Sequence, residues 1–141
     1  MNTRVNTESF EKILSRNDTG ITGGHMGGIT IPRVENDIIA LFPKLDPKEY
    51  NPSVFIEVKG PNGVIHRLRF VYYNNKLHKK GTRNEYRLTY LTDFLRNSNA
   101  MAGDAFRVTR NEHGKLEMEV VKKSDEKPSS IIKLRGWNRV C

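Results

Sequence analysis

The alternation of hydrophobic and polar residues predicts a pair of antiparallel strands in the middle of the chain. Residues 53–59 alternate and are rich in β-branched side chains, and a Gly-Pro-Asn-Gly turn at 60–63 separates them from a second alternating run at 64–73. Successive side chains of a strand point to opposite faces, so Arg67 and Arg69 share the face that we expect to point outward. The other face is expected to join the core; its residues are Val64, His66, Leu68, Phe70 and Tyr72.

The remainder of the chain is typical of short strands with a few short helical segments. Hydrophobic spacings of three and four predict helices at residues 7–16 and 34–42 and a helical turn at 92–96. Further strands are expected at 29–31, 85–90, 105–110, 116–122 and 131–134, with Trp137 as a late anchor. Polar residues predict loops at 74–84, 111–114 and 125–130. The pattern as a whole favours a mostly β fold with short helices, a barrel or pseudobarrel.

Length and composition set the domain organisation. The 141 residues fit a single domain, 1–141, with a pseudobarrel core at about 8–123 and a C-terminal tail at about 124–141. The chain has neither an apolar run long enough to span a membrane nor a signal-peptide core, so we expect a cytoplasmic protein without a membrane partner. The single cysteine, Cys141, excludes an internal disulfide, and no Cys/His cluster has the spacing of a zinc site. We therefore expect no cofactor in this domain.

Charge makes a polyanion the expected partner. The formal net charge is +8, and residues 65–87 carry seven lysines and arginines but only one acid, Glu85. A charge run is commonly just a solvated face of a protein. Here it is interleaved with tyrosines and asparagines, which also bond phosphates and bases, so a nucleic-acid surface is favoured.

Two segments have side chains suited to reading DNA. In residues 82–87, the guanidinium groups of Arg83 and Arg87 can bond O6 and N7 of guanine, and Glu85 can accept from the amino group of cytosine. The other reading of this segment is a solvated turn in which Glu85 pairs with an arginine. The second segment, residues 22–28, is rich in glycine, which lets backbone N–H groups approach phosphates closely, but the same composition also suits a plain linker.

Two other functions remain open from the residues alone. Asp46, Glu57 and Lys59 resemble the carboxylates and lysine of a PD-(D/E)xK nuclease, which would make the chain a small Mg²⁺-dependent nuclease. A charged outer strand face gives the same Glu-x-Lys pattern without any metal. Stacking platforms for a single strand or RNA are offered by a different set, Tyr72, Tyr73 and Tyr86.

Several strings, in a fixed order over residues 14–90, resemble the N-terminal effector-DNA-binding domain of EcoRII-like type II restriction endonucleases. They include Leu-Ser-Arg-Asn-Asp-Thr-Gly-Ile-Thr-Gly-Gly-His at 14–25, Asn-Pro-Ser-Val-Phe at 51–55, Tyr-Tyr-Asn at 72–74 and Thr-Arg-Asn-Glu at 82–85. A relative in this family carries an aromatic residue where this chain has Thr30, and it carries lysines where this chain has Gly81 and Tyr86. These departures affect individual base contacts more than the fold.

The resemblance implies a DNA-binding pseudobarrel, like that of plant B3 domains, with two arms that grip the major groove at a CCWGG-like, G·C-flanked site. It implies double-stranded DNA as the partner of a prokaryotic, monomeric domain. It also implies that cleavage and Mg²⁺ belong to a separate, covalently linked nuclease domain. The base-reading residues expected on this basis are His25, Met26, Thr30, Arg83, Asn84, Glu85, Tyr86 and Arg87. The expected backbone contacts are Gly23, Gly24, Arg67, Arg69, Lys79 and Lys80.

Overall fold

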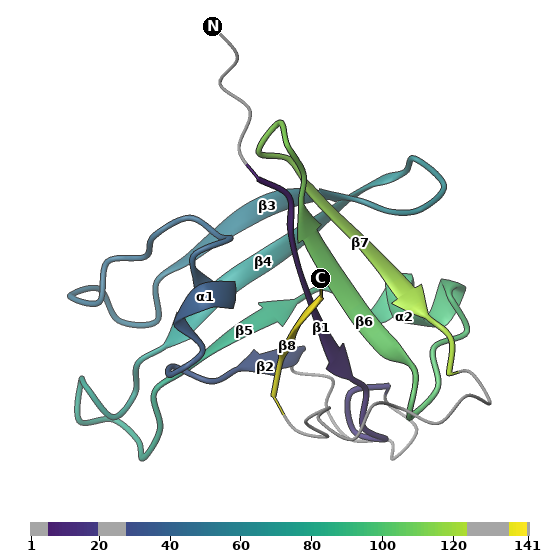
Figure 1. The fold of residues 1–141 in the computed structure, drawn as a ribbon. Helices are drawn as coiled ribbons and strands as arrows, with labels where there is room; N and C mark the ends of the chain where they lie inside the picture. The colour runs from purple at the N-terminus through teal and green to yellow at the C-terminus, as the bar shows by residue number, and fades with distance from the viewer. Residues whose placement is uncertain (1–5, 20–27, 124–135, 141) are drawn as a thin grey trace, which may run out of the picture.

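The fold is a single strongly bent β-sheet with two short helices (Figure 1). It is seen in a computed structural model that describes residues 6–19, 28–123 and 136–140. Within these residues the strands are β1 (Glu8–Ile13), β2 (Ile29–Ile31), β3 (Ser53–Lys59), β4 (Ile65–Tyr73), β5 (Glu85–Thr89), β6 (Ala105–Arg110), β7 (Leu116–Val121) and β8 (Asn138–Val140). The helices are α1 (Asn36–Ile39) and α2 (Thr92–Asn97).

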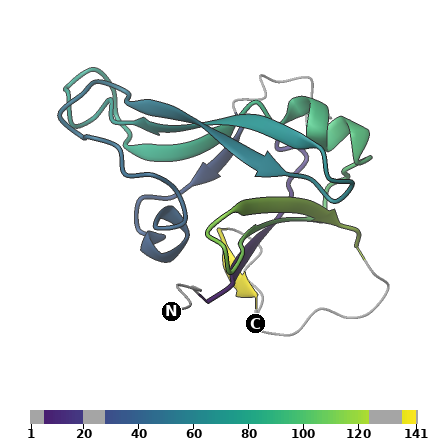
Figure 2. The ribbon, with the colours of Figure 1, turned by 90° about the horizontal axis from the view of Figure 1, so that it is seen from above.

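The sheet forms two layers that fold over one another. The strand order is β2-β5-β4-β3-β7-β6-β1-β8, and neighbours are antiparallel except at the β3–β7 junction. There the pairing is parallel and spans only Val58↔Leu116 and Lys59↔Glu117. Figure 2 shows the two layers meeting at this junction, with β2, β5, β4 and β3 in one and the remaining strands in the other. The short junction lets the sheet bend into a half-barrel.

The core lies between the two layers. Phe70 from one layer and Phe106 from the other are completely buried, and Trp137 packs edge-on against Phe106 with its ring centroid 6.1 Å away. The two helices lie at opposite ends of the half-barrel (Figure 2), where Ile38 and Phe94 bury their side chains. Burial of a large apolar side chain contributes roughly 1.5–3 kcal/mol, so this core is the main source of stability.

The helix predicted for residues 7–16 is wrong, because most of this segment is strand β1. Phe10 and Leu14 are buried, and β1 pairs along its whole length with β6. A spacing of four residues fits both a helix turn and two strand repeats, so these apolar positions alone did not distinguish the two structures. The partner strand, which is remote in sequence, decides in favour of the strand.

The helix predicted for residues 34–42 is shorter than expected. Only Asn36–Ile39 is helical, and the backbone then tightens, with Leu41 N–H donating to Ile38 O and Phe42 N–H to Ile39 O. Val34, the first apolar residue of the predicted helix, is 79% exposed. The helical turn predicted near 92–96 is confirmed as α2.

Strand β4 confirms most of the predicted core face. Leu68, Phe70 and Tyr72 are buried, whereas Val64 precedes the strand and is exposed. Val71 is completely buried although it lies on the other face of the strand.

The C-terminal anchor is also confirmed. Trp137 is buried, and its indole N–H donates to the carbonyl of Thr30 at 3.1 Å. Strand β8, which follows it and pairs with β1, was not predicted. The loop predicted at 125–130 and the strand predicted at 131–134 lie outside the described residues.

Candidate nucleic-acid interface

Three of the predicted reading residues, Thr30, Glu85 and Arg87, share the outer face of the β2–β5–β4 layer. Thr30 on β2 lies opposite Arg87 on β5, and Arg87 in turn lies opposite Val71 on β4. Glu85, two residues before Arg87, is on the same face and opposite Tyr73. The antiparallel register therefore brings Thr30 next to Arg87, although 57 positions separate them in the sequence.

A hollow opens beside this face, where the loop between β4 and β5 leaves the sheet. We call this loop, residues 74–84, the arm; it projects from one end of the half-barrel (Figures 1 and 2). The hollow has a volume of about 680 Å³. Its lining residues are Thr30, Pro32, Arg33, Lys76, Leu77, Lys79, Thr82, Arg83, Asn84 and Glu85.

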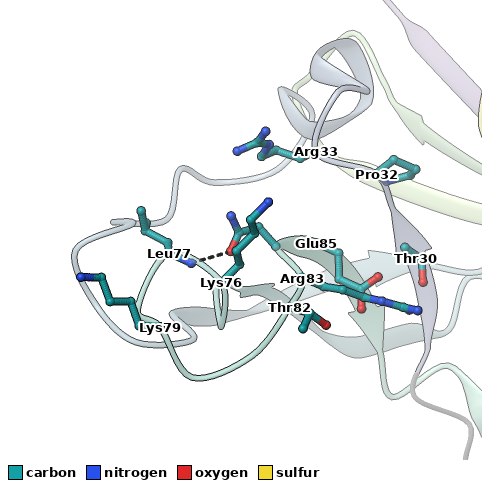
Figure 3. A pocket seen from close by; sticks show the side chains of 10 residues that line it. Thr30, Pro32, Arg33, Lys76, Leu77, Lys79, Thr82, Arg83 and Glu85 are labelled. Atoms are coloured by element: carbon teal, nitrogen blue, oxygen red, sulfur yellow. Dashed lines mark hydrogen bonds between the residues drawn. The ribbon is translucent and has the colours of Figure 1, made fainter.

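The charge of this hollow is strongly positive. Four of its lining residues are cations, namely Arg33, Lys76, Lys79 and Arg83, and its single acid is Glu85. Figure 3 shows Arg83 extending toward Thr30 and Glu85, while Lys79 lies apart near the tip of the arm. Low-dielectric walls lined by one sign of charge concentrate the field, so the hollow attracts anions.

Glu85 and Arg87 form an ion pair within the layer. Arg87 donates from a terminal nitrogen to a Glu85 oxygen at 3.2 Å, and both side chains are half-buried. A partly exposed pair of this kind contributes little to stability, typically below about 1 kcal/mol. Its consequence is geometric, because each planar group restricts the rotamers of the other and Arg87 is kept beside Glu85, which lines the hollow. The pairing of Glu85 with an arginine that the sequence suggested is thus present, but both residues lie on strand β5 and not in a turn, and Arg83 is exposed.

Tyr86 lies on the opposite face of β5 from these residues. Its ring stacks on Tyr72 at 4.3 Å and on Phe70 at 5.4 Å between centroids, on the core side of the layer. Burial, followed by the neighbouring Tyr72, raises the pKa of the Tyr86 hydroxyl above its ordinary value. The structure therefore does not bring Tyr86 together with the other predicted base readers; strand alternation points it inward.

Asn84 shapes the arm. Its side-chain oxygen accepts a hydrogen bond from the backbone N–H of Leu77 at 3.0 Å, drawn as the dashed line in Figure 3. A backbone bond from Lys76 N–H to Arg83 O, 3.1 Å long, closes the arm beside it. One acceptor of the Asn84 amide is thus committed to the loop, which leaves its NH₂ group as the part suited to an outside acceptor.

The predicted backbone-contacting cations fall into two groups. Lys79 and Lys80 are exposed on the arm, and the Lys80 ammonium lies 4.7 Å from the centre of the Tyr50 ring. Arg67 lies toward the other end of β4, with its guanidinium over the Phe55 ring at 4.1 Å. Arg69 stands between the two groups on the same outer face.

Sequence reasoning missed some cations of the hollow and the support of the arm. Arg33 and Lys76 line the hollow, and the signal for Lys76 was the basic run that contains it. Asn74, which is completely buried, bonds to Asn51 and neighbouring residues. Both asparagines stand in strings that carried the family resemblance, but nothing in those strings indicated that they pair.

The remaining predicted sites are placed as follows. His25, Met26, Gly23 and Gly24 lie outside the described residues. Among the described residues no three His, Cys, Asp or Glu side chains are grouped as a metal site would require. Of the proposed nuclease set, Asp46 accepts a hydrogen bond from Lys48 N–H in a turn, and Glu57 on β3 lies opposite Arg67 on β4.

No helix in the described part of the chain has the length and apolar character of a membrane span.

Comparison with solved structures identifies the fold. The chain is similar to the B3 domain of the restriction endonuclease UbaLAI with cognate DNA, with a TM-score of 0.64, 16% identity, and coverage of 98% of this chain and 89% of that one. It is also similar to FUS3 in the Arabidopsis FUS3-DNA complex, with a TM-score of 0.61, 19% identity, and coverage of 81% and 96%. The mostly β, B3-like pseudobarrel expected from the sequence is thereby confirmed.

Comparison of sequences identifies the family. The chain is 43% identical over 83 residues to the type II restriction enzyme EcoRII of Escherichia coli, a stretch that covers 57% of this chain but only 20% of that enzyme. The family described as "Restriction endonuclease EcoRII, N-terminal" matches residues 3–127. The chain therefore belongs to the EcoRII N-terminal family of restriction endonuclease domains.

Proposed function

We propose that the chain is a sequence-specific binding domain for double-stranded DNA, which it reads from the major groove with the arm and the adjoining edge of β5 and β2. The observation that carries this proposal is the hollow in which four cations surround a single carboxylate. Phosphates are attracted by the cations, whereas the ordered carboxylate adds an acceptor that a purely non-specific binder does not need.

The groups at the hollow match the chemistry of a G·C-rich groove. Arg83 and Arg87 each present a guanidinium fork suited to O6 and N7 of guanine, and Glu85 presents an acceptor for the amino group of cytosine. The existing bond between Arg87 and Glu85 keeps donor and acceptor side by side, as adjacent base pairs require. Thr30 next to Arg87 can contribute a hydroxyl or methyl contact.

Phosphate contacts hold the arm in the groove. Arg33, Lys76 and Lys79 line the same hollow as Arg83 and Glu85, and Lys80 is exposed next to Lys79 on the arm. Such contacts give affinity and orientation, and they make binding depend on salt. The major groove is about 12 Å wide and admits a two-stranded ribbon, which is the form that β4, the arm and β5 present.

The relatives support the biological setting of this proposal. One structural neighbour is a restriction-endonuclease B3 domain with cognate DNA, and another is a complex of a plant protein with DNA. The chain spans about a fifth of the length of EcoRII. We infer that it reads a CCWGG-like site and acts alongside a nuclease domain, to which cleavage and Mg²⁺ belong. Incubation of the chain with plasmid and Mg²⁺ is then expected to leave the plasmid uncut.

Selection from randomised duplex DNA tests the proposal. The expected result is enrichment of a short G·C-flanked motif, with affinity for that motif at least about a thousandfold above that for scrambled duplex at the same salt concentration. Recovery of unselected sequence, or stronger binding to single strands than to duplexes, would contradict it.

Arg83→Ala tests the role of one side chain. It is expected to cost roughly 1–3 kcal/mol on the selected site and to relax discrimination at one base pair, because a bidentate contact is lost. Arg96→Ala is the matched control, since Arg96 is exposed in the last turn of α2, away from the arm. Equal weakening of cognate and scrambled DNA by Arg83→Ala would remove Arg83 from the base readers.

A further inference from the structure

The arm is fastened to a segment that precedes β3. This segment, residues 46–51, is called the brace here. Asn74 at the root of the arm is completely buried, and its NH₂ group donates to Pro47 O at 3.0 Å and to Glu49 O at 2.7 Å. Its oxygen accepts from Asn51 N–H at 2.8 Å, while Asn51 accepts from Asn74 N–H at 3.1 Å. Asn74 thus joins the two segments through four hydrogen bonds, three from its side-chain amide and one from its backbone N–H, and the two bonds shared with Asn51 are reciprocal.

A second set of contacts fastens the arm farther from its root. His78 bonds through Nε2 to the Pro47 carbonyl at 3.0 Å, and its ring meets Tyr50 edge-on at 5.6 Å. The Tyr50 hydroxyl donates to the Asn75 side-chain oxygen at 2.6 Å. The same ring carries the Lys80 ammonium at 4.7 Å. Tyr50 and His78 therefore connect the brace to three points along the arm.

We propose that the brace sets the recognition geometry of the arm, and that Tyr50 and His78 are positioning residues for DNA reading which need not touch DNA. The proposal rests on the proposed function of the arm. Without the brace, the arm would be held by the ends of β4 and β5 and by a few internal bonds, such as those of Asn84. When a loop samples many conformations, its apparent affinity is the intrinsic affinity multiplied by the fraction of time it spends in the binding-competent conformation.

This role predicts a selective effect on cognate DNA. Base contacts need side chains placed to within about half an ångström, whereas phosphate contacts by flexible lysines tolerate movement. Tyr50→Ala and His78→Ala should therefore each lower the affinity for the selected site by about five- to tenfold, and that for scrambled duplex by less than about twofold. Tyr50→Phe retains the ring that contacts Lys80 and His78, so it should lose less than Tyr50→Ala.

The controls separate positioning from direct contact and from unfolding. His113→Ala is the matched control, because His113 is exposed in the β6–β7 turn and belongs to the other layer. Tyr50 is 47% exposed, so its removal should leave the melting temperature nearly unchanged. The salt dependence of binding should also stay unchanged, since no phosphate contact is lost.

Each outcome of this experiment decides the proposal. A loss on cognate DNA with an unchanged salt slope supports it. A slope reduced by about one unit would show that Tyr50 or His78 supports a phosphate contact itself, and it would overturn the positioning role. Unchanged cognate affinity in both variants would also overturn it.

Hydrogen exchange of the free protein measures, without DNA, whether the brace orders the arm. The amides of His78 and Lys80, which donate to Asn74 O and Asn75 O within the arm, should exchange faster in Tyr50→Ala than in the wild type, while core amides stay protected. If the wild-type chain selected no DNA sequence, the proposed function would fail, and this measurement would still decide whether the brace orders the arm. Identical exchange in variant and wild type would reject the brace.

Discussion

Replacing Gly28 by alanine tests how closely β2 must approach β5. Gly28 directly precedes β2 and has a φ of +85°, in the left-handed region that L side chains avoid. A Cβ added at this position would lie 2.0 Å from Leu88 O and 2.8 Å from Leu88 C. Both atoms belong to the backbone of β5, next to Arg87, so they cannot move aside as a flexible side chain would.

The magnitude follows from comparison with a second glycine. Gly63, in the β3–β4 turn, has nearly the same φ, +83°, but nothing lies within 4 Å of an added Cβ. Gly63→Ala should therefore cost only the backbone term, about 1–2 kcal/mol. Gly28→Ala adds a clash that shifts β2 from β5, and overpacking of this kind costs typically a further 1–3 kcal/mol. The expected total is about 2–5 kcal/mol, a large part of the stability of an ordinary domain.

Urea unfolding of the two variants provides the assay. Trp137 is the only tryptophan and is buried, so its fluorescence reports the transition without a label. Gly28→Ala should lower the midpoint clearly more than Gly63→Ala, with similar slopes. It should also weaken cognate DNA binding, because the displaced backbone carries Arg87. Equal losses in the two variants would show that β2 and β5 are not packed as closely as described, and the register that joins Thr30 to Arg87 would have to be abandoned.

Three further changes test the surface and the scaffold. Lys80→Ala should weaken cognate and scrambled DNA about equally and reduce the salt slope by about one unit; an unchanged slope would remove Lys80 from the phosphate contacts. Burial alone would raise the pKa of Asp104, but hydrogen bonds from Lys122 and two backbone amides outweigh it and lower the pKa below its usual 3.8. A carboxyl with a lowered pKa stabilises the fold at neutral pH, and this contribution is lost as acid protonates the group. Asp104→Asn should therefore lower the free energy of unfolding by about 1–3 kcal/mol at pH 7 and by less below about pH 4. Urea titration at each pH measures the difference. Trp137→Phe removes the bond to Thr30 O and should cost about 1–2 kcal/mol in thermal unfolding followed by circular dichroism; no loss would show that this bond is unimportant.

The sequence was sufficient for the elements that local pattern determines. The β3–β4 hairpin follows from an alternating run on each side of a Gly-Pro-Asn-Gly turn, and the β6–β7 hairpin follows from the same logic around 111–114. The basic run at 65–87 predicted where cations gather, and the family strings predicted the B3-like pseudobarrel. Each of these signals is carried by residues close together in the chain, so no knowledge of distant partners was needed.

Only the tertiary structure decided what depends on remote partners. Strand β1 is a strand because β6 and β8 pair with it, and Tyr86 faces the core because the register of β5 is set by β2 and β4. The hollow arises from β2, the segment after it and the arm, and the brace joins residues 46–51 to Asn74. Local sequence determines which conformations a segment favours, but long-range pairing determines which side of a strand meets solvent and which loops touch. For this reason the chemistry of the candidate site was predictable from its residues, and its geometry was not.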